Sequence, residues 1–180
     1  MPPRQTASSD DAIIRRATPG DAGAVARLLH DFQQEFDEPS PGIDALEERY
    51  ADLIRNRDMT VLLAGEGPDG FAQIRYRPWV YSAGPQAHSY LEELYVVPSL
   101  RGRGTGRRLL KAAVDTARGE GATHMELGTT EADAAARALY ESIGFSNHEG
   151  GPGGPVMLFY EIDLTGRADA RPRISRRRRS

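Results

Sequence analysis

A glycine-rich run between two apolar segments is the part of this sequence best suited to bind a ligand. Residues 101–106 read Arg-Gly-Arg-Gly-Thr-Gly, after a strand-like run at 91–97 and before a helix-like run at 107–118. A strand, a glycine turn and a helix N-terminus bring several backbone N–H groups to one point, where an anion can accept their hydrogen bonds. The run therefore predicts a site for a phosphorylated ligand.

The spacing of the glycines separates three phosphate-binding motifs. The dinucleotide pattern G-x-G-x-x-G fails, because a count from Gly102 places Arg107 at the third glycine position. The nucleoside-triphosphate pattern also fails, because no Gly-Lys-Ser or Gly-Lys-Thr follows the turn. The pattern that remains is Arg-x-x-Gly-x-Gly, formed by Arg101, Gly104 and Gly106.

Two segments carry a resemblance to a known family. Residues 94–110, LYVVPSLRGRGTGRRLL, resemble the acetyl-CoA-binding motif of the GNAT superfamily of N-acetyltransferases. Residues 136–145, ARALYESIGF, resemble the second signature of that superfamily, and the two segments occur in the family's order. The order of predicted elements also matches, so the resemblance covers roughly residues 12–165.

The resemblance implies acetyl-CoA as co-substrate, with its pyrophosphate held by the glycine turn. Gly102, Gly104 and Gly106 let a phosphate come close to the backbone, and glycine permits the positive φ that such turns often need. The helix that begins at Thr105 adds its dipole, worth ~0.3–1 kcal/mol for a favourably placed surface charge.

Three arginines surround these glycines and could form charge-assisted hydrogen bonds with phosphates. Arg101 is expected to order the loop. For Arg103 and Arg107, phosphate contact and plain solvent exposure both stay open.

The strand before the turn and the later helix complete the predicted cofactor site. In the family the pantetheine arm pairs with the backbone of that strand, which here is formed by Tyr95, Val96 and Val97. Asp133 stands where the family commonly has an asparagine that contacts the cofactor. Aspartate keeps an acceptor but loses the amide donor and adds a charge, so it cannot make every contact of that asparagine.

Acetyl transfer to an amine requires a base, because an amine with a pKa near 10 is almost wholly protonated at neutral pH. The candidates are Glu92 and Glu93 in the strand before the turn, and Glu126 on the neighbouring strand. Adjacent strand residues face opposite sides, so at most one of the first two is expected to face the acetyl group. Each could instead be a salt-bridged strand residue, and the acids together could simply attract a cationic substrate.

Tyr140 is the candidate for the group that meets the leaving thiolate. The resemblance implies a tyrosine at this position whose hydroxyl contacts the coenzyme A sulfur, as general acid or as hydrogen-bond donor. The alternative is a ring that only packs in the core, as expected for Leu139, Ile143 and Phe145.

Hydrophobic periodicity predicts a single layered α/β domain. Strands are expected at residues 12–17, 60–64, 71–76, 88–97, 123–127 and 156–164, and helices from residue 22, at 43–56, at 105–118 and at 132–143. The family resemblance implies a GNAT-like mixed, mostly antiparallel central sheet flanked by helices.

Charge divides the 180-residue chain into a body and a tail. Residues 166–180 contain seven arginines and one acid, and we expect a disordered tail there, as at residues 1–11, around a domain at 12–165. Without the tail, 16 basic and 25 acidic residues remain, a balance that favours cationic ligands and disfavours nucleic acid. A polyanion-binding role for the tail is the weakest alternative.

Composition also bears on the reaction mechanism, on metal binding and on the location of the protein. The absence of cysteine excludes disulfides and thiolate nucleophiles, which agrees with direct attack of the amine on the thioester. The four histidines (His30, His88, His124 and His148) lack metal-site spacing, so no metal is expected. No apolar run is long enough to cross a bilayer and no signal segment is evident, so a cytoplasmic protein without a membrane partner is expected.

The acceptor is not specified by the sequence. The variable regions expected to form its site are residues 32–43, 77–86 and 148–155, with Glu35, Asp37, Glu38, Trp79 and Tyr81 as possible lining residues. A small-molecule amine and a peptide N-terminus or lysine both remain open, as do a monomer and a homodimer. The alternative from another class is a noncatalytic acyl-CoA-binding regulatory module.

Overall fold

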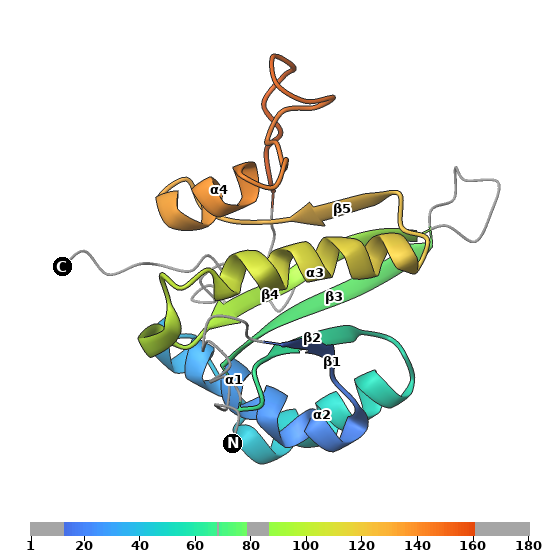
Figure 1. Ribbon diagram of the computed structural model, residues 1–180, viewed down its shortest axis with the longest axis vertical. Helices are drawn as coiled ribbons and strands as arrows, with labels where there is room; N and C mark the ends of the chain where they lie inside the picture. Colours follow the sequence, from blue (N-terminus) through green and yellow to red (C-terminus); the bar gives the residue numbers. More distant parts are fainter. Residues whose placement is uncertain (1–12, 68, 79–86, 161–180) are drawn as a thin grey trace, which may run out of the picture.

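A five-stranded sheet forms the centre of the computed structural model, which describes residues 13–67, 69–78 and 87–160 (Figure 1). The strands are β1 (Ile14–Arg16), β2 (Thr60–Ala64), β3 (Gly70–Pro78), β4 (Ala87–Val96) and β5 (His124–Leu127), and they lie in the sheet in chain order. The first four pair antiparallel, whereas β4 and β5 are parallel. The predicted mixed, mostly antiparallel sheet is confirmed.

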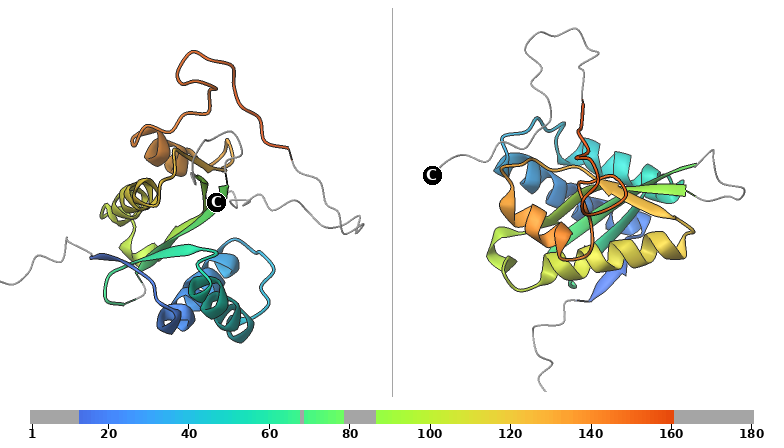
Figure 2. Two further views of the ribbon diagram at one scale, coloured as in Figure 1. Left: turned by 90° about the vertical axis from the view of Figure 1, so that its right-hand side faces the viewer. Right: turned by 90° about the horizontal axis from the view of Figure 1, so that it is seen from above.

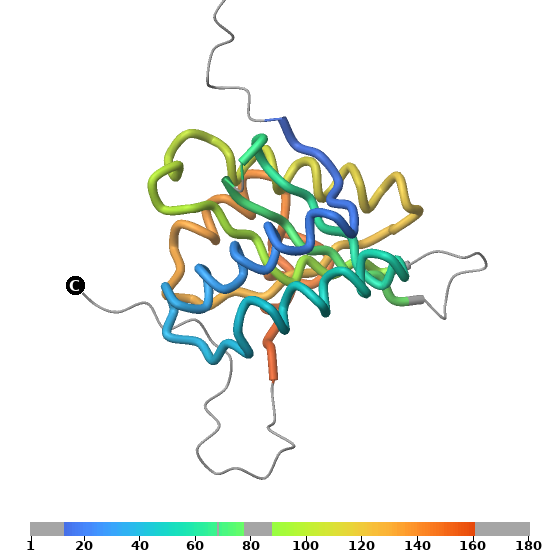
Figure 3. The backbone as a smooth tube through the Cα atoms, turned by 90° about the horizontal axis from the view of Figure 1, so that it is seen from below, coloured from blue at the N-terminus to red at the C-terminus, as the bar shows by residue number. Residues whose placement is uncertain are grey.

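Helices cover both faces of this sheet (Figure 2). Helices α1 (Ala22–Glu35) and α2 (Ile43–Arg55) lie side by side on one face, which Figure 3 views from below. Helices α3 (Thr105–Gly119) and α4 (Ala134–Glu141) lie on the other, and short 3-10 turns occur at η1 (Pro19–Asp21) and η2 (Pro98–Leu100).

Strand alternation explains the two layers of core. In β2, Val61 and Leu63 face α1 and α2, whereas Leu62 and Ala64 face α3, and all four are buried. The α3-side cluster also receives Leu109 and neighbouring apolar residues of α3. Burying apolar surface on both faces is what makes a continuous apolar strand such as β2 stable at the centre of a sheet.

The start of α1 is fixed by a capping box at the 3-10 turn η1. The Asp21 carboxylate accepts from the backbone N–H of Thr18 at 2.8 Å, and the Arg15 guanidinium donates to both of its oxygens at 2.6 and 2.9 Å. These bonds hold the pKa of the Asp21 carboxyl well below its usual range, and the bond from Arg15 has the largest effect. The predicted N-terminal helix signal at residues 18–21 is confirmed in position.

The predicted final strand is wrong over the part that the structure describes. Residues 156–160 follow a short hairpin in which His148 bridges Val156, and they join no strand of the sheet. The apolar composition of this segment suits a strand, yet alternation and composition do not say which edge a strand pairs with. Residues 161–164 of that prediction, and the tails predicted at 1–11 and 166–180, lie outside the described residues.

Candidate active site

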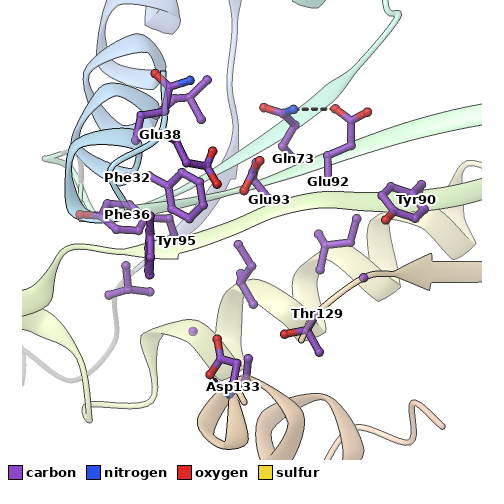
Figure 4. Close-up of a pocket in the computed structure, with 18 of the residues that line it drawn as sticks. Phe32, Phe36, Glu38, Gln73, Tyr90, Glu92, Glu93, Tyr95, Thr129 and Asp133 are labelled. Atoms are coloured by element: carbon purple, nitrogen blue, oxygen red, sulfur yellow. Dashed lines mark hydrogen bonds between the residues drawn. The ribbon is translucent and has the colours of Figure 1, made fainter. Parts of the chain in front are cut away.

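One cleft of about 1160 Å³ crosses β4 and joins the two halves of the molecule (Figure 4). On the α1 side it is lined by Phe32, Phe36, Glu38 and Gln73, and on the α3–α4 side by the glycine loop, the segment after β5 and α4. Figure 4 shows the carboxylates of Glu92 and Glu93 above β4, and Asp133 and Thr129 below it. The cleft therefore brings together parts of the chain that are far apart in the sequence.

The cleft exists because β4 and β5 part. Their parallel pairing runs from the His88–His124 pair to the Leu91–Leu127 pair and stops there, while β4 continues to Val96. Beyond this point the β5 side of β4 has no strand partner among residues 87–160. The hydrogen bonds of the parallel β4–β5 pairing therefore end at Leu91.

A β-bulge lies at the point of divergence. Gln73 of β3 pairs with Glu93, whereas its neighbour Ile74 pairs with Leu91, so Glu92 is an extra residue in β4. Consistent with this, Leu91 and Leu94 both pack in the α3-side cluster although they are three residues apart.

The bulge corrects the expectation that the two adjacent glutamates face opposite sides of the strand. Both carboxylates lie on the α1 side of β4, and both line the cleft. Simple alternation fails here because the extra residue restarts the two-residue period.

Glu92 is held by two donors. Its carboxylate accepts from the side-chain amide of Gln73 at 2.7 Å and pairs with the Arg75 guanidinium at 2.7 Å. The Gln73 carbonyl in turn accepts from the Tyr50 hydroxyl at 2.5 Å. Burial, together with the charges of Glu93 and Glu92, raises the pKa of Tyr50, so this tyrosine stays a proton donor to Gln73. The chain of bonds fixes Glu92 in one orientation.

Glu126 does not reach the cleft. It lies on β5, where its carboxylate pairs with Arg77 at 2.7 Å and lies 3.5 Å from the His88 ring. The residue is absent from the cleft lining. The sequence offered it because it lies on the strand next to β4, but the two strands pair over four residues only, from His88–His124 to Leu91–Leu127.

The glycine loop presents backbone amides to the cleft. Gly102 and Gly104 have φ values of 76° and 79°, a left-handed conformation that other residues adopt only with strain. Gly104 is the N-cap of α3 and has no side-chain cap, so no side chain competes for the first-turn amides of the helix. Thr105 is buried, and its hydroxyl accepts from Arg108 at 3.2 Å. Gly106 lines the cleft and leaves space between Leu139 and Val96.

Arg101 ties the glycine loop to α1. Its Nε donates to the Val96 carbonyl at 2.9 Å, and its two terminal nitrogens bond both Glu35 oxygens at 2.6 and 2.7 Å. The guanidinium also lies 5.5 Å from the centre of the Tyr95 ring. These contacts connect the glycine loop to β4 and α1.

The other two arginines differ from Arg101. Arg107 donates to the hydroxyl and the carbonyl of Ser142, at the end of α4, and so connects α3 to α4. Arg103 is exposed, and its carbonyl accepts from Arg108 at 3.2 Å.

The strand residues before the loop offer backbone rather than side chains. Tyr95 is buried on the α1 side, with its ring edge-on to Phe32 and Phe71, and Val96 is buried on the α3 side. Val97 packs on the α1-side cluster, and its N–H donates to the Asp69 carbonyl at 3.0 Å.

Asp133 and Tyr140 lie at the two ends of α4 and both line the cleft. The Asp133 carboxylate accepts from the Ala136 backbone N–H at 3.1 Å, so it is the N-cap of α4. Burial first, and then the charges of Asp133 and Glu93, raise the pKa of the Tyr140 hydroxyl to about 12.

Comparison with known proteins decides the family. The model of the acetyltransferase (GNAT) family matches residues 25–145. This chain belongs to the GNAT family of acetyltransferases.

Individual GNAT relatives are similar in sequence to most of this chain. The uncharacterized N-acetyltransferase YhfO of Bacillus subtilis is 33% identical, over 76% of this chain and 91% of its own length. The aminoglycoside N(6')-acetyltransferase type 1 of Stenotrophomonas maltophilia is 31% identical, over 76% and 87%. A solved structure from Arthrobacter sp. FB24, described as an acetyltransferase, is 42% identical with a TM-score of 0.78 and covers 88% of this chain and 99% of its own.

The region expected to bind the GNAT acceptor is only partly in place. Glu38 and the aromatic residues near it line the cleft, whereas Glu35 pairs with Arg101 and Asp37 is absent from the lining. Trp79 and Tyr81 lie outside the described residues. Residues 148–155, the third region expected to bind the acceptor, do not line the cleft. Phe159, which lies shortly after them in the chain, does line it.

Sequence reasoning missed several polar residues of the cleft, and four of them illustrate the reason. Tyr50, Gln73, Arg75 and Tyr90 come from α2, β3 and β4 and meet only in the fold. A sequence signal existed for the last three, since polar side chains in strongly apolar strands often mark a site, but no spacing connects α2 to β3.

Two negative observations apply to the described residues alone. Residues 13–67, 69–78 and 87–160 contain no group of three or more histidine or acidic side chains placed to hold a metal ion. Within the same part of the chain, no helix is long and apolar enough to span a membrane.

Proposed function

We propose that this GNAT protein transfers the acetyl group of acetyl-CoA to a primary amine by direct attack. The observation that carries the proposal is the single cleft that crosses β4, with Glu93 on one side and Tyr140 on the other. An amine that enters from the α1 side meets a carboxylate. A thioester bound on the α4 side meets a tyrosine hydroxyl.

The α3–α4 side of the cleft fits acetyl-CoA. The first-turn amides of α3 and the left-handed Gly102 and Gly104 suit the pyrophosphate, because backbone N–H groups can approach it without a side chain between. The β5-facing side of β4 beyond Leu91, where the pairing with β5 has ended, suits a pantetheine arm that bonds to the backbone as an added strand would. When bound, acetyl-CoA supplies an activated acetyl thioester.

The arginines of the loop support this arrangement in different ways. Arg101 holds the loop against Val96 and Glu35, so we assign it the ordering role. Arg103 is exposed beside the glycines and is available to a phosphate, whereas Arg107 is engaged with Ser142 and acts through the position of α4. Thr105 contributes its backbone amide, since its hydroxyl accepts from Arg108.

Glu93 is the proposed general base. Glu92 already accepts from Gln73 and pairs with Arg75, so these contacts engage its carboxylate oxygens. Glu93 and Glu38 both line the cleft on the α1 side of β4 (Figure 4), and the charge of Glu93 contributes to the raised pKa of Tyr140. Glu93 therefore accepts the proton of the incoming ammonium, directly or through one water.

Tyr140 is the proposed donor to the sulfur of the leaving group. With a pKa of about 12 its hydroxyl is protonated throughout the neutral range, so it can always donate a hydrogen bond to a developing thiolate. A hydroxyl of such high pKa is a weak proton donor. We therefore assign it hydrogen-bond stabilisation in preference to complete proton transfer.

Asp133 is proposed to act on the cofactor side mainly as the cap of α4. One of its oxygens accepts from Ala136, and its charge raises the pKa of Tyr140 and so helps to keep that hydroxyl protonated. A carboxylate has no amide donor, so it cannot replace every contact of the asparagine common in the family.

The acceptor half of the cleft favours a cation. Glu38, Glu92 and Glu93 line it, and the field of three carboxylates attracts a protonated amine before Glu93 removes its proton. The relative from Stenotrophomonas maltophilia is named for an aminoglycoside, which is a polyamine. The proposed acceptor is accordingly a small-molecule amine or the N-terminus or lysine of a peptide.

The test is an acetyl-transfer screen with purified protein. Release of free coenzyme A is measured with aminoglycosides, small diamines, amino acids and peptides, each against an acceptor-free control. Turnover with one acceptor class and a product acetylated on nitrogen supports the proposal. Normal acetyl-CoA binding by calorimetry with no turnover on any class contradicts it and indicates a noncatalytic acyl-CoA-binding module.

A further inference from the structure

A buried glutamine of α1 has an unused hydrogen-bond acceptor in the acceptor half of the cleft. One face of α1 and its C-cap lines the cleft through Leu29, Phe32, Gln33 and Phe36, and Gln33 is the polar member of this stripe. Gln33 is 7% exposed, and its side-chain carbonyl oxygen has no hydrogen-bond donor in the part of the chain that the structure describes. A buried carbonyl oxygen without a donor is unfavourable, so in a cleft it indicates a ligand that donates a hydrogen bond.

The carboxylate of Glu38 lies in the turn that follows this helix. The backbone N–H of Glu38 donates to the backbone carbonyl of Gln33 at 2.8 Å, which fixes the turn against the end of α1. Glu38 is half-buried and lines the cleft, and no hydrogen bond or ion pair among the described residues engages its carboxylate. Glu35, by contrast, pairs with Arg101 at 2.6 Å. The Glu38 carboxylate is therefore available to a cationic ligand.

Two aromatic rings belong to the same part of the cleft. The ring centroids of Phe32 and Phe36 lie 4.8 Å apart, with an angle of 50° between the ring planes, and both residues line the cleft. Figure 4 shows both rings and Glu38 on the α1 side. Aromatic faces attract organic cations, and their apolar surface suits a methylene chain. We name Phe32, Gln33, Phe36 and Glu38 the α1 subsite.

We propose that the α1 subsite binds a second ammonium group of the acceptor, so that the substrate is a diamine or a polyamine. An ammonium group carries three N–H donors, which suit the Gln33 carbonyl oxygen and the Glu38 carboxylate. Alkyl amines have a pKa near 10, so both ends of a diamine are charged at neutral pH before the reaction. The two charges are then bound in two places, one in the α1 subsite and one at Glu93.

This inference rests on the acetyl transfer proposed above. The reacting ammonium loses one proton to Glu93 and becomes a neutral amine. The new C–N bond forms as the C–S bond of the thioester breaks, and a second proton of the amine goes to the leaving thiolate. The ammonium in the α1 subsite keeps all its protons and only holds the substrate in place.

A different charged group defines the alternative acceptor. Arg49 lines the cleft from α2, on the helix face that also carries Leu46 and Tyr50. A carboxylate at the far end of the acceptor would contact Arg49, and the substrate would then be an amino acid. Such an anionic end offers no donor to Gln33 and is repelled by Glu38, so the α1 subsite favours the diamine.

The test compares acceptors that differ only at the end remote from the reacting amine. Linear diamines of increasing length are assayed for release of coenzyme A, each beside the monoamine and the amino carboxylate of the same length. At its best length the diamine should exceed the monoamine ~10-fold or more in kcat/KM, as hydrogen bonds to a charged group predict. Equal values overturn the inference and leave the acetyl transfer standing. A preference for the amino carboxylate also overturns it and assigns the far end to Arg49.

Variants of the subsite connect this preference to particular side chains. Glu38→Gln and Gln33→Met keep the size of each side chain and should each raise the KM for the diamine ~10-fold, with the KM for the monoamine unchanged. Glu48→Gln and Gln34→Met are the matched controls, because both side chains are exposed and absent from the cleft lining. A preference for the diamine that survives both subsite variants overturns the inference.

A binding measurement separates this inference from the proposed function. The diamine is titrated by calorimetry into protein saturated with coenzyme A, which requires no turnover. Binding that Glu38→Gln weakens ~10-fold supports the α1 subsite even if no acceptor is acetylated. Binding that neither subsite variant weakens overturns the inference alone. The absence of both binding and turnover overturns the inference together with the proposed acetyl transfer.

Discussion

The two halves of the cleft differ in whether backbone or side chains form their lining. The α3–α4 half presents backbone: the amides of the glycine loop and the open side of β4. The α1 half presents side chains, with Glu38, Gln73 and Glu93 converging from a loop, from β3 and from β4. The first half suits a ligand common to a whole family, while the second can be changed residue by residue without disturbing the sheet.

This difference separates what each half can recognise. Backbone amides are the same in every protein and recognise a phosphate through geometry alone. Carboxylates and aromatic side chains select by charge and shape. Substitutions in the two halves should therefore affect different kinetic constants, and the predictions below test that separation.

The largest effect is expected at the acceptor side. Glu93→Gln removes the proposed base and should lower kcat by ~10³-fold, within the range typical of general base catalysis. Glu92→Gln is the matched control and should cost no more than ~10-fold, because Glu92 is already bonded to Gln73 and Arg75. Steady-state kinetics with the best acceptor measures both. A larger loss for Glu92→Gln reverses the assignment of the base.

A smaller loss is expected for Tyr140→Phe on the donor side. It removes one hydrogen bond to the leaving group and should lower kcat by ~10²-fold with little change in acetyl-CoA affinity. Because the pKa of Tyr140 is about 12, the shape of the pH profile should stay unchanged from about pH 6 to pH 10. Tyr76→Phe, at a partly buried tyrosine outside the cleft, is the control. An unchanged kcat would remove Tyr140 from the mechanism.

The glycine loop should respond in affinity rather than in turnover. Gly104→Val forces a β-branched residue into a left-handed conformation and should weaken acetyl-CoA binding by ~10-fold or more, since the strain is ~1–2 kcal/mol. Gly119→Val is the control, because a Cβ there meets open space and φ is not positive. Calorimetric titration with acetyl-CoA measures both variants. Normal binding by Gly104→Val contradicts the proposed phosphate site.

Weakening the ion pair between Glu35 and Arg101, which connects the two halves of the cleft, should change cofactor affinity only modestly. Glu35→Gln weakens its pair with Arg101, whose side chain is 41% exposed, and a partly exposed pair is worth ~0.2–1 kcal/mol. We expect a two- to five-fold rise in the KM for acetyl-CoA, on the order of that free energy. Glu141→Gln, which weakens the exposed pair with Arg137, should leave KM unchanged. An equal effect of both variants would mean that Arg101 does not hold the loop through α1.

The capping box should affect stability and leave catalysis unchanged. Asp21→Asn should lower the free energy of unfolding by ~1 kcal/mol at neutral pH. The folded pKa of Asp21 is depressed, so its contribution is present above the unfolded pKa of ~3.9 and is lost as the pH falls further. Urea titrations at pH 7 and at about pH 3 should therefore show a smaller difference at the lower pH. Asp115→Asn, at an exposed pair with Arg118, is the control.

Local patterns predicted most of the fold. The glycine loop, the capping signal at residues 18–21 and the helix around Tyr140 depend on short-range spacing, and all three occur where the sequence placed them. Non-local features were missed. The pairing edge of the last strand and the meeting of Tyr50 with Gln73 depend on tertiary contacts that no local pattern encodes.

The candidate site shows the same limit at the level of single residues. The sequence and its family resemblance pointed to Glu92, Glu93 and Tyr140, and all three line the cleft. The sequence could not show that Glu92 contacts Gln73 and Arg75, since these contacts form only in the folded sheet. The sequence also offered Glu126, because the number of residues over which β4 and β5 pair cannot be predicted from the sequence of either strand.

The bulge in β4 has a consequence for how such a site can arise. If Glu92 were removed, Ile74 would still pair with Leu91 and Gln73 would still pair with Glu93. The strand would then be regular, and all its remaining side chains would stay on the sheet faces that they occupy now. The second carboxylate is thus equivalent to a single-codon insertion in an otherwise ordinary strand. An insertion of that kind can add a charged group to a binding site in one genetic step, while the hydrophobic core on both sides of the sheet stays intact.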